Sequence, residues 1–476
     1  MAERTAILSD RLSSAQFGLS GGMTSSPLRG ARFDILGWRL DPTDDRQVLA
    51  DFYCDRHGHF TEGVRFPEAT RPVAAAAAEA PALLTLLTIA LGASYYKLAA
   101  SPQLSLPPGG PAASRLAAAL YGEGLAEFRV RAGLPFPDDL TLVEDTGPRP
   151  PQIAAPSKDQ RARSSALVAF GGGKDSYVAR RLMAKHGVPC RLASVVLSPA
   201  VRDVLIATAP TAPIFIWRRL DPRLSARTPL GFNGHIPITA INALCLALQA
   251  VLDGNREVIF ANERSADEPT MVLEDGITAN HQYSKSSAFE LILQEAIAEA
   301  GAAAPAVFSI LRPYSELWIG RAFAAETEAF PRFTSCNRNF RMAGDATQRW
   351  CGACPKCAFT SLILAPFLSE TENRIAFGRQ FLDLDALQPF YAQLLGLSDH
   401  KPWECVGTIA ECRAALGLAA RREDLSRTMA VQHFAPRLTG LQDPAELDAL
   451  VDACLRPVAS PTLPRTYRPT AEGGAL

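Results

Sequence analysis

Between residues 164 and 332, short runs of apolar residues alternate with longer stretches in which apolar residues recur at helical spacing. The short runs have the length of buried strands, and the longer stretches have the length of helices. Strands that alternate with helices predict an α/β fold with a doubly wound, mostly parallel sheet. The predicted strands cover residues 166–170, 192–197, 213–217, 257–261 and 307–311, with helices at 174–186, 201–209 and 284–300.

The pattern changes on both sides of this α/β region. Residues 33–67 alternate in patches typical of antiparallel strands, and residues 74–98 and 112–132 have the spacing of helices. Residues 145–163 are rich in proline and charge, which is typical of a linker. The predicted organisation is an N-terminal α+β domain (30–145), a linker (146–163), an α/β domain (164–332), a cysteine-rich knuckle (333–360), a helical region (361–456) and a tail (457–476).

Composition limits the class of protein. Hydrophobic residues make up 47% of the 476 positions, as in a globular protein, and a net charge of −1 gives no reason to expect nucleic acid as a partner. The alanine-rich stretch 74–100 is interrupted by charges and a proline, so it favours a buried helix over a membrane insertion. The N-terminus has no apolar signal, and most cysteines are scattered singly, so we expect a cytoplasmic protein.

A glycine turn follows the first α/β strand. Gly171, Gly172 and Gly173 precede Lys174, Asp175 and Ser176, where a helix begins. Such a turn directs backbone N–H groups and the positive end of the helix dipole at one spot, which suits a phosphate. Lys174 and Ser176 can donate to phosphate oxygens, and Asp175 can help to hold Mg²⁺. The sequence is neither a Walker A loop nor G-x-G-x-x-G, and an ordinary glycine turn is the structural alternative.

Polar residues follow other predicted strands. Because the carboxyl ends of parallel strands form one rim, these clusters are expected to lie near the glycine turn. A loop-to-helix transition at 280–286 adds a second anion site, although a capped helix with a polar loop would have the same composition. The candidates are Asn233 and His235 before one helix, Asn262, Glu263, Arg264 and Ser265 after one strand, and Asn280, His281, Gln282, Tyr283, Ser284, Lys285 and Ser286.

Four cysteines have the spacing of a metal site: Cys336, Cys351, Cys354 and Cys357. Four thiolates without an open position are typical of structural Zn²⁺. An iron–sulfur cluster is the alternative metal centre, because ferredoxins also use C-x2-C-x2-C. If Cys336 is not a ligand, it becomes a second-rank candidate for a base.

Resemblances to known families narrow the range of functions. The run G-G-G-K-D-S resembles the S-G-G-x-D-S loop of the PP-loop ATP pyrophosphatases. This resemblance implies a HUP-like fold for the α/β domain. In this chain Gly171 replaces the first serine of the loop, which removes one hydroxyl donor. Together with A-N-E-R-S-A, H-Q-Y-S-K-S and W-C-G-A-C-P-K-C, this run resembles the MurL family over residues 30–420. A zinc knuckle behind a PP-loop also resembles the deazaguanine nitrile synthases.

The MurL resemblance implies an ATP-dependent epimerase. It would convert the terminal L-glutamate of UDP-N-acetylmuramoyl-L-alanyl-L-glutamate to D-glutamate through an acyl-adenylate, in peptidoglycan precursor synthesis, with ATP and Mg²⁺ and a functional link to a muramoyl-L-alanine:L-glutamate ligase. The glycine turn with Asn262, Arg264 and Ser265 would bind ATP, and Asn233, His235, Asn280, Gln282, Ser284 and Ser286 the substrate. Candidates for catalysis are His281, Lys285, Tyr283, Glu263 and Asp175.

Two alternatives remain open. One is another PP-loop ATP pyrophosphatase, such as an adenylating ligase, an amidating enzyme or a tRNA-modifying enzyme. The other is a zinc protein that binds a nucleotide without turnover, which the missing serine at Gly171 would favour.

Overall fold

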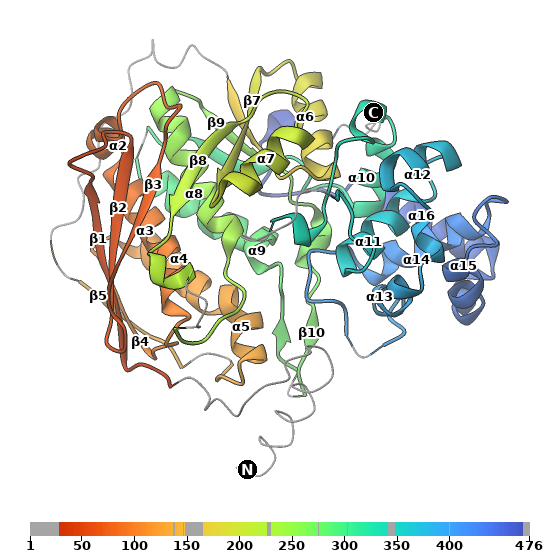
Figure 1. Cartoon of the computed structure of the whole chain (residues 1–476), viewed down its shortest axis with the longest axis horizontal. Coiled ribbons are helices and arrows are strands. Elements are labelled where there is room, and N and C mark those ends of the chain that lie inside the picture. Colours follow the sequence, from red (N-terminus) through yellow and green to blue (C-terminus); the bar gives the residue numbers. More distant parts are fainter. Residues whose placement is uncertain are drawn as a thin grey trace.

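The computed structural model describes residues 28–136, 139–145, 147, 165–225, 230–274, 276–301, 303–340, 348–398 and 400–469. Within these residues, one ten-stranded sheet has the order β12-β9-β6-β7-β8-β3-β2-β1-β4-β5 (Figure 1). Its strands are β1 (Arg32–Leu40), β2 (Gln47–Cys54), β3 (Gly58–Arg65), β4 (Gln103–Leu106), β5 (Thr141–Glu144), β6 (Ala166–Ala169), β7 (Cys190–Val196), β8 (Ile214–Arg219), β9 (Glu257–Phe260) and β12 (Ala306–Ser309). The two-residue strands β10 (Met271–Val272) and β11 (Thr278–Ala279) pair separately.

The parallel α/β region confirms the prediction from the sequence. Strands β12, β9, β6, β7 and β8 pair in parallel, and each predicted strand of this region is present. Val168 and Ile259 are register partners in β6 and β9, so the loops after these two strands leave the sheet side by side. The intervening helices are α6 (Lys174–Lys185), α7 (Pro199–Thr208), α8 (Ile238–Asp253) and α9 (Ser287–Glu299).

The N-terminal strands continue the same sheet. Strand β3 pairs antiparallel with β8, so the sheet crosses the predicted domain boundary. The antiparallel β1–β2–β3 arrangement was expected, but β4 and β5, which pair in parallel beside β1, were not. The proposed linker, apart from Gly147, lies outside the described residues, and the division into two domains stays a prediction.

Two predicted N-terminal helices are broken. Pro81 cannot donate a backbone hydrogen bond, and it starts a new helix where one long helix was expected. Gly122 ends the next helix, and a 3₁₀ turn separates it from its successor. The resulting helices are α2 (Val73–Glu79), α3 (Pro81–Tyr96), α4 (Pro111–Tyr121) and α5 (Ala126–Arg131).

Helix α3 is buried almost throughout, as its alanine-rich sequence suggested. In the described part of the chain, no single helix is long and apolar enough to cross a membrane. Among the helices described, the pair α2 and α3 meets the length and composition criteria together, and it bends by 109° at the break.

The C-terminal helices form a separate layer at the end of the molecule opposite β1–β5 (Figure 1). They are α10 (Glu316–Phe323), α11 (Pro355–Leu364), α12 (Glu370–Phe377), α13 (Gln388–Leu394), α14 (Ile409–Ala420), α15 (Met429–Phe434) and α16 (Pro444–Leu455). The described part of the predicted tail packs back onto the sheet, because the Tyr467 hydroxyl donates to Glu257 over 2.6 Å.

Candidate active site

The candidate site is a pocket of about 480 Å³ at the carboxyl ends of β6, β7 and β9. Its walls are formed by the glycine turn, the start of α8, the end of β9 and, further along the chain, Lys285, Ser335, Lys356 and Cys405. Its charged and thiol-bearing lining residues are Asp175, Arg218, Lys285, Lys356 and Cys405. The pocket thus brings together segments that are more than 200 positions apart in the sequence.

The glycine turn has a backbone that only glycine adopts easily. Gly172 has a φ of +76°, and a Cβ atom there would lie 2.9 Å from the Thr208 hydroxyl oxygen. A Cβ on Gly173 would meet the Ser335 hydroxyl at 2.8 Å, whereas one on Gly171 would meet nothing within 4 Å. Gly171, Gly173, Asp175 and Ser176 line the pocket. The turn is therefore shaped as the sequence indicated, with an open position only at Gly171.

Lys174 faces away from the pocket. Its ammonium is buried and pairs with Asp175 Oδ1 at 2.5 Å and with the carboxylate of Glu316. Burial alone would lower the pKa of Lys174, but Asp175 and Glu316 raise it above its ordinary value. Burial raises the pKa of Glu316 to about 8. Lys174 therefore fixes the Asp175 carboxylate at the pocket wall and does not itself reach the space where a ligand would lie.

The cluster after β9 is divided between two environments. Asn262 lines the pocket, and Glu263 is buried beside it with a pKa raised by burial. Arg264 instead donates to the backbone oxygens of Arg456, Ala453 and Cys454 near the end of α16. The Ser265 hydroxyl donates to Glu411 over 2.7 Å. These last two side chains connect the α/β region to the C-terminal helices.

The polar segment 280–286 is mostly structural in its contacts. Asn280 donates to the Ala266 oxygen, and Gln282 donates to the Val406 oxygen. Tyr283 packs against Phe289, and Ser286 caps α9 by accepting from the Phe289 N–H, as predicted. Ser284 is buried. Lys285 is the member of this segment that lines the pocket.

Three ionisable side chains from distant parts of the chain meet behind the pocket. His281 Nδ1 lies 2.5 Å from Glu127 Oε2, and His235 Nδ1 lies 3.5 Å from the same oxygen. Because an ionised carboxylate only accepts, His281 is the donor. Burial alone would lower the pKa of His281, but Cys405 and Glu127 raise it to about 10. Burial and the neighbouring His281 lower the pKa of His235 to about 3.

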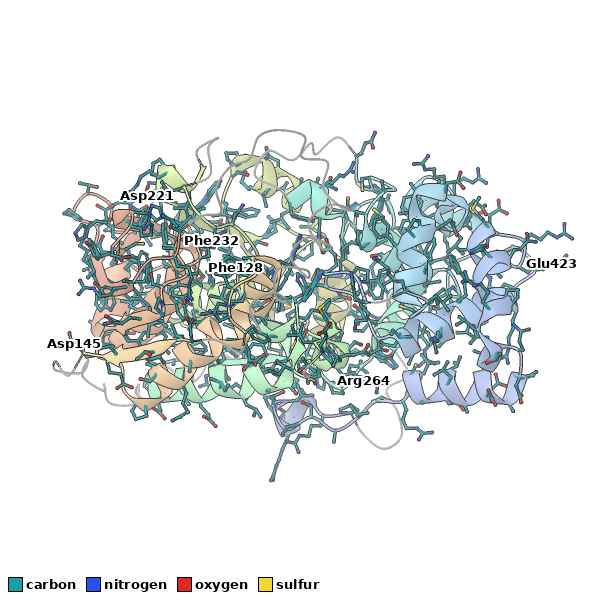
Figure 2. All side chains as sticks on the ribbon, turned by 90° about the horizontal axis from the view of Figure 1, so that it is seen from below. Phe128, Asp145, Asp221, Phe232, Arg264 and Glu423 are labelled. Atoms are coloured by element: carbon teal, nitrogen blue, oxygen red, sulfur yellow. The ribbon has the colours of Figure 1, made fainter. Side chains whose placement is uncertain are left out.

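Aromatic packing holds this cluster in place. Phe128 on α5 lies against Phe232, with ring centroids 6.3 Å apart, and the two labelled rings lie together in Figure 2. Gly234 lets the backbone approach Phe128 closely, because a Cβ there would lie 2.7 Å from that ring. Glu127 and His235, each next to one of these contacts, are thereby brought face to face. Lys97 donates to Asn233 Oδ1 over 2.8 Å at the edge of the cluster.

Cys405 connects the cluster to the pocket. It lines the pocket wall, and it lies close enough to His281 and Lys285 to raise the pKa of both. Lys356 donates to its backbone oxygen. Burial alone would raise the pKa of the Cys405 thiol, but Lys285, His281 and Lys356 hold it well below its ordinary value. These neighbours favour the thiolate form of Cys405, which lines the pocket.

The four predicted metal-binding cysteines do gather. The sulfurs of Cys336, Cys351, Cys354 and Cys357 all lie within 4.8 Å of one another. Those of Cys351 and Cys357 are 3.8 Å apart. Four sulfurs at about 2.3 Å from a tetrahedral ion would be about 3.8 Å apart, so the set fits a metal ion. Cys336 belongs to this cluster and therefore is not the free base that the sequence left as an option.

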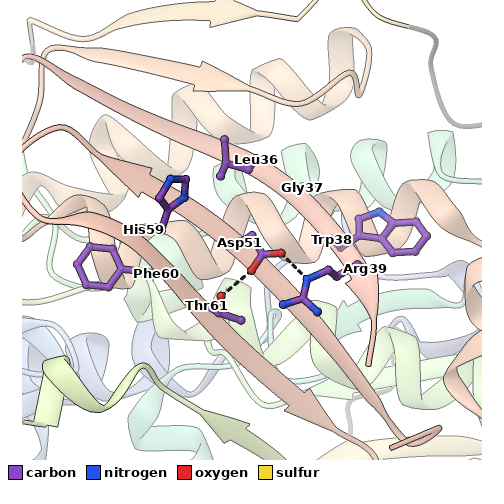
Figure 3. A pocket seen from close by; sticks show the side chains of 8 residues that line it. All are labelled: Leu36, Gly37, Trp38, Arg39, Asp51, His59, Phe60 and Thr61. Atoms are coloured by element: carbon purple, nitrogen blue, oxygen red, sulfur yellow. Dashed lines mark hydrogen bonds and ion pairs between the residues drawn. The ribbon is translucent and has the colours of Figure 1, made fainter. Parts of the chain in front are cut away.

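A second hollow, of about 350 Å³, lies on the face of β1–β3 (Figure 3). Its carboxylate, Asp51, already accepts from Arg39 over 2.8 Å and from Thr61 over 2.6 Å. Since that pair of contacts satisfies the carboxylate, the pocket at the glycine turn is the stronger candidate for chemistry.

Two family models together match most of the chain, including the segments that form the pocket. The MurL N-terminal domain matches residues 24–310, which include the sheet, the glycine turn and the polar segment 280–286. The MurL C-terminal domain matches residues 332–449, which include the four cysteines and Cys405.

The chain belongs to the MurL family.

Three relatives of this MurL family member carry the name UDP-N-acetyl-alpha-D-muramoyl-L-alanyl-L-glutamate epimerase. The protein from Micromonospora sp. is 40% identical over 375 residues, 78% of this chain and 82% of its own. The protein from Salinispora tropica is 36% identical over 425 residues, which are 89% of this chain and 90% of its own. The protein from Xanthomonas oryzae pv. oryzae is 37% identical over 402 residues, which are 83% of this chain and 87% of its own. The similarity therefore includes both halves of the pocket.

Several MurL site residues had no signal in the sequence pattern. Glu127 stands in a short amphipathic helix, where a glutamate usually faces solvent. Cys405 is a single cysteine in a loop, without a neighbouring motif. Lys356 lies between two cysteines of the metal-binding cluster, and that cysteine motif gives no indication that the lysine has a separate role. In each case only the tertiary contacts place the residue at or behind the pocket.

Proposed function

We propose that this protein is an isomerase that inverts the terminal L-glutamate of UDP-N-acetylmuramoyl-L-alanyl-L-glutamate to D-glutamate. The reaction consumes ATP and releases AMP and pyrophosphate through an acyl-adenylate. A ligase that adds L-glutamate to the muramoyl-L-alanine must supply the substrate, and both reactions belong in the cytoplasm, where the nucleotide-linked precursor is made. The names of three relatives support the substrate.

One observation carries the proposal: a single pocket combines the glycine turn with a buried cation and a thiol. Gly171, Gly173 and Ser176 lie on one wall, and Lys285 and Cys405 on another. The first set suits a phosphate chain, and the second suits a carbonyl that gains negative charge. An enzyme that adenylates a carboxylate and then works on the adjacent carbon needs both in one place.

Adenylation solves the chemical problem of the inversion. The Cα–H bond beside a free carboxylate is a very weak acid, because its loss would put a second negative charge next to the first. In the acyl-adenylate the carbonyl is no longer anionic and can accept the electron pair as an enolate. Hydrolysis after inversion restores the acid and releases AMP.

We assign the phosphate end of the pocket to the glycine turn, as in the PP-loop ATP pyrophosphatases that it resembles. Helix α6 begins at Lys174 with no side chain capping its first N–H groups, so these can bind pyrophosphate oxygens. Asp175 offers the oxygen ligand that Mg²⁺ prefers, and Lys174 orients it. Bound Mg²⁺ would neutralise the charge of the leaving pyrophosphate.

We assign the carbonyl end to Lys285. Burial would lower the pKa of this ammonium, but Cys405 and Glu263 raise it, so Lys285 stays charged in the pocket wall. A fixed, buried cation stabilises an enolate oxygen more strongly than water does. Tyr283 shares the 3₁₀ turn Tyr283–Lys285 with this lysine and packs on Phe289.

The cysteine cluster has a structural part in this proposal. Cys336, Cys351, Cys354 and Cys357 would hold Zn²⁺ without an open coordination position. Residues of the same two segments, Ser335, Asn337 and Lys356, line the pocket. The metal would thereby fix one wall of the active site without taking part in the reaction.

The proposal is tested by incubating the protein with ATP, Mg²⁺ and the UDP-linked L-Ala-L-Glu substrate. We expect D-glutamate in the product, together with AMP and pyrophosphate. Asp175→Asn should stop AMP formation, whereas Asp51→Asn, in the second hollow, should not. AMP that appears only when an amine is added would indicate a ligase instead, and the absence of AMP would indicate a nucleotide-binding protein without turnover.

A further inference from the structure

We propose that Cys405 is the residue that exchanges the Cα proton on one face of the adenylated glutamate, with His281 and Glu127 as positioning residues behind it. This inference rests on the proposed function, because it names a group that carries out the central step of that reaction. It departs from the sequence-based candidates, none of which included Cys405.

The pocket itself selects Cys405. Among the described residues that line it, Asp175 and Cys405 are the two whose side chains become anionic bases near neutral pH. Asp175 pairs with Lys174 at the phosphate end, next to the glycine turn. Lys285 and Lys356 are ammonium groups and have no free pair to accept a proton. Cys405 is therefore the base at the carbonyl end.

The earlier candidates occupy other positions. His281 pairs with the carboxylate of Glu127 and lies near Cys405, and it does not itself line the pocket. Glu263 is 4% exposed and does not line the pocket. Tyr283 packs its ring against Phe289. Each of these groups acts on a proton at Cα only through another residue.

The chain Cys405–His281–Glu127 has the geometry of an activated thiol. His281 lies near Cys405, and its Nδ1 donates to Glu127 over 2.5 Å. The Arg131 guanidinium donates to the other Glu127 oxygen over 2.9 Å, which fixes the carboxylate. A base oriented by a third group is the general arrangement by which proteins activate a cysteine. Here the cations also lower the pKa of the Cys405 thiol well below its ordinary value.

The step balances as a proton transfer. The Cys405 thiolate takes the proton from Cα of the acyl-adenylate, the electron pair of the broken C–H bond forms the double bond between Cα and the carbonyl carbon, and the carbonyl π pair moves to the oxygen, next to Lys285. Cys405 is then a neutral thiol, and the substrate is an enolate. A separate donor protonates the opposite face. In the reverse direction, the Cys405 thiol returns its proton to Cα.

The test uses Cys405→Ala and Cys405→Ser in the full-length protein, with Cys190→Ala as the matched control. Cys190 is a partly buried thiol at the start of β7 that does not line the pocket. Each variant is incubated in D₂O with ATP, Mg²⁺ and either the L-Glu or the D-Glu form of the UDP-linked substrate. Pyrophosphate, AMP, glutamate chirality and deuterium at Cα are measured, and thermal unfolding verifies that the variants fold.

We expect both Cys405 variants to release pyrophosphate and AMP within a few-fold of the wild type. Inversion should fall by about 10²–10⁴-fold, the usual contribution of a general acid–base group. Deuterium exchange should be lost from one substrate form and kept in the other, because the second face has its own acid–base group. Cys190→Ala should behave as the wild type.

Two results would overturn the inference. Inversion by Cys405→Ala at the wild-type rate would show that another group moves the proton. Loss of AMP with pyrophosphate release intact would assign the sulfur to covalent acyl transfer instead. Failure of the proposed function itself is distinct, because the wild type would then form neither AMP nor D-glutamate.

Discussion

Glu127 Oε2 accepts a hydrogen bond from His281 Nδ1 over 2.5 Å, although the two residues are 154 positions apart. The contact connects α5, in the N-terminal half, to the loop before α9. His281 in turn contacts Cys405 in the C-terminal half, so the candidate active site depends on three segments of the chain. The sheet that passes through both predicted domains is what holds the first two in place.

Glu127→Gln tests this relationship. The amide is nearly the same size but loses the charge of Glu127, which together with Cys405 raises the pKa of His281 to about 10. That pKa should then fall, because burial still lowers it and only Cys405 still raises it, so the imidazolium is lost at lower pH. The alkaline limb of the pH–rate profile should move to lower pH, with about a 10-fold or greater loss of turnover near pH 8. An unchanged profile would contradict a positioning role for Glu127.

The alkylation rate of Cys405 gives a second pH-dependent readout. A thiol with a pKa near 8.5 loses roughly 80-fold of its thiolate between pH 8 and pH 6. Because the pKa of Cys405 is held well below this value, its reaction with iodoacetamide should change less than about 3-fold over the same range. Mass spectrometry of the Cys405 peptide measures the rate. Cys190, whose pKa is raised by burial, should show the steep dependence.

Removal of one sulfur should reveal the structural part of the cysteine cluster. We expect Cys354→Ser to lose its metal and to lower the free energy of unfolding by more than about 4 kcal/mol, as is typical when a structural metal is lost. Metal analysis of the wild type should give one Zn²⁺ per chain. Iron with acid-labile sulfide would favour the iron–sulfur alternative. Cys190→Ser should keep the metal.

The glycine turn allows a matched pair of substitutions. Gly172→Ala places a Cβ at a φ of +76° and 2.9 Å from the Thr208 hydroxyl, so it should cost about 1–2 kcal/mol in the free energy of unfolding and raise the KM for ATP. Gly171→Ser meets open space and supplies the hydroxyl donor that the PP-loop pattern has at this position. It should unfold as the wild type does and leave the KM for ATP unchanged or lower. A higher KM for Gly171→Ser would contradict phosphate binding at this turn.

Local patterns predicted the parts of the site that are encoded over a few consecutive residues. The glycine turn follows a buried strand, and its neighbour Asn262 follows the next strand in the sheet, so the rim of a parallel sheet brings them together. Ser286 and Ser315 cap their helices, because an N-cap requires only a serine before a helical run. The sulfurs of the four cysteines also lie together in the structure, because these residues are close to one another in the sequence.

What the sequence could not predict depends on tertiary contacts. Arg264 and Ser265 share the polar run after β9, but their partners are on the C-terminal helices, which no local pattern reveals. The buried ammonium of Lys174 pairs with the carboxylate of Glu316, which is 142 positions away in the sequence. Cys405 had no motif, and its lowered pKa arises from cations supplied by two other segments. The functions of such residues become visible only when the fold assembles them.

The most direct test of the central claim is the fate of the Cα hydrogen in the wild-type protein. The UDP-linked L-Ala-L-Glu substrate is incubated in D₂O with Mg²⁺, with and without ATP. Inversion through an acyl-adenylate predicts D-glutamate with one deuterium at Cα, formed together with AMP and only when ATP is present. D-glutamate that forms without ATP, or that retains its original hydrogen, would contradict the account.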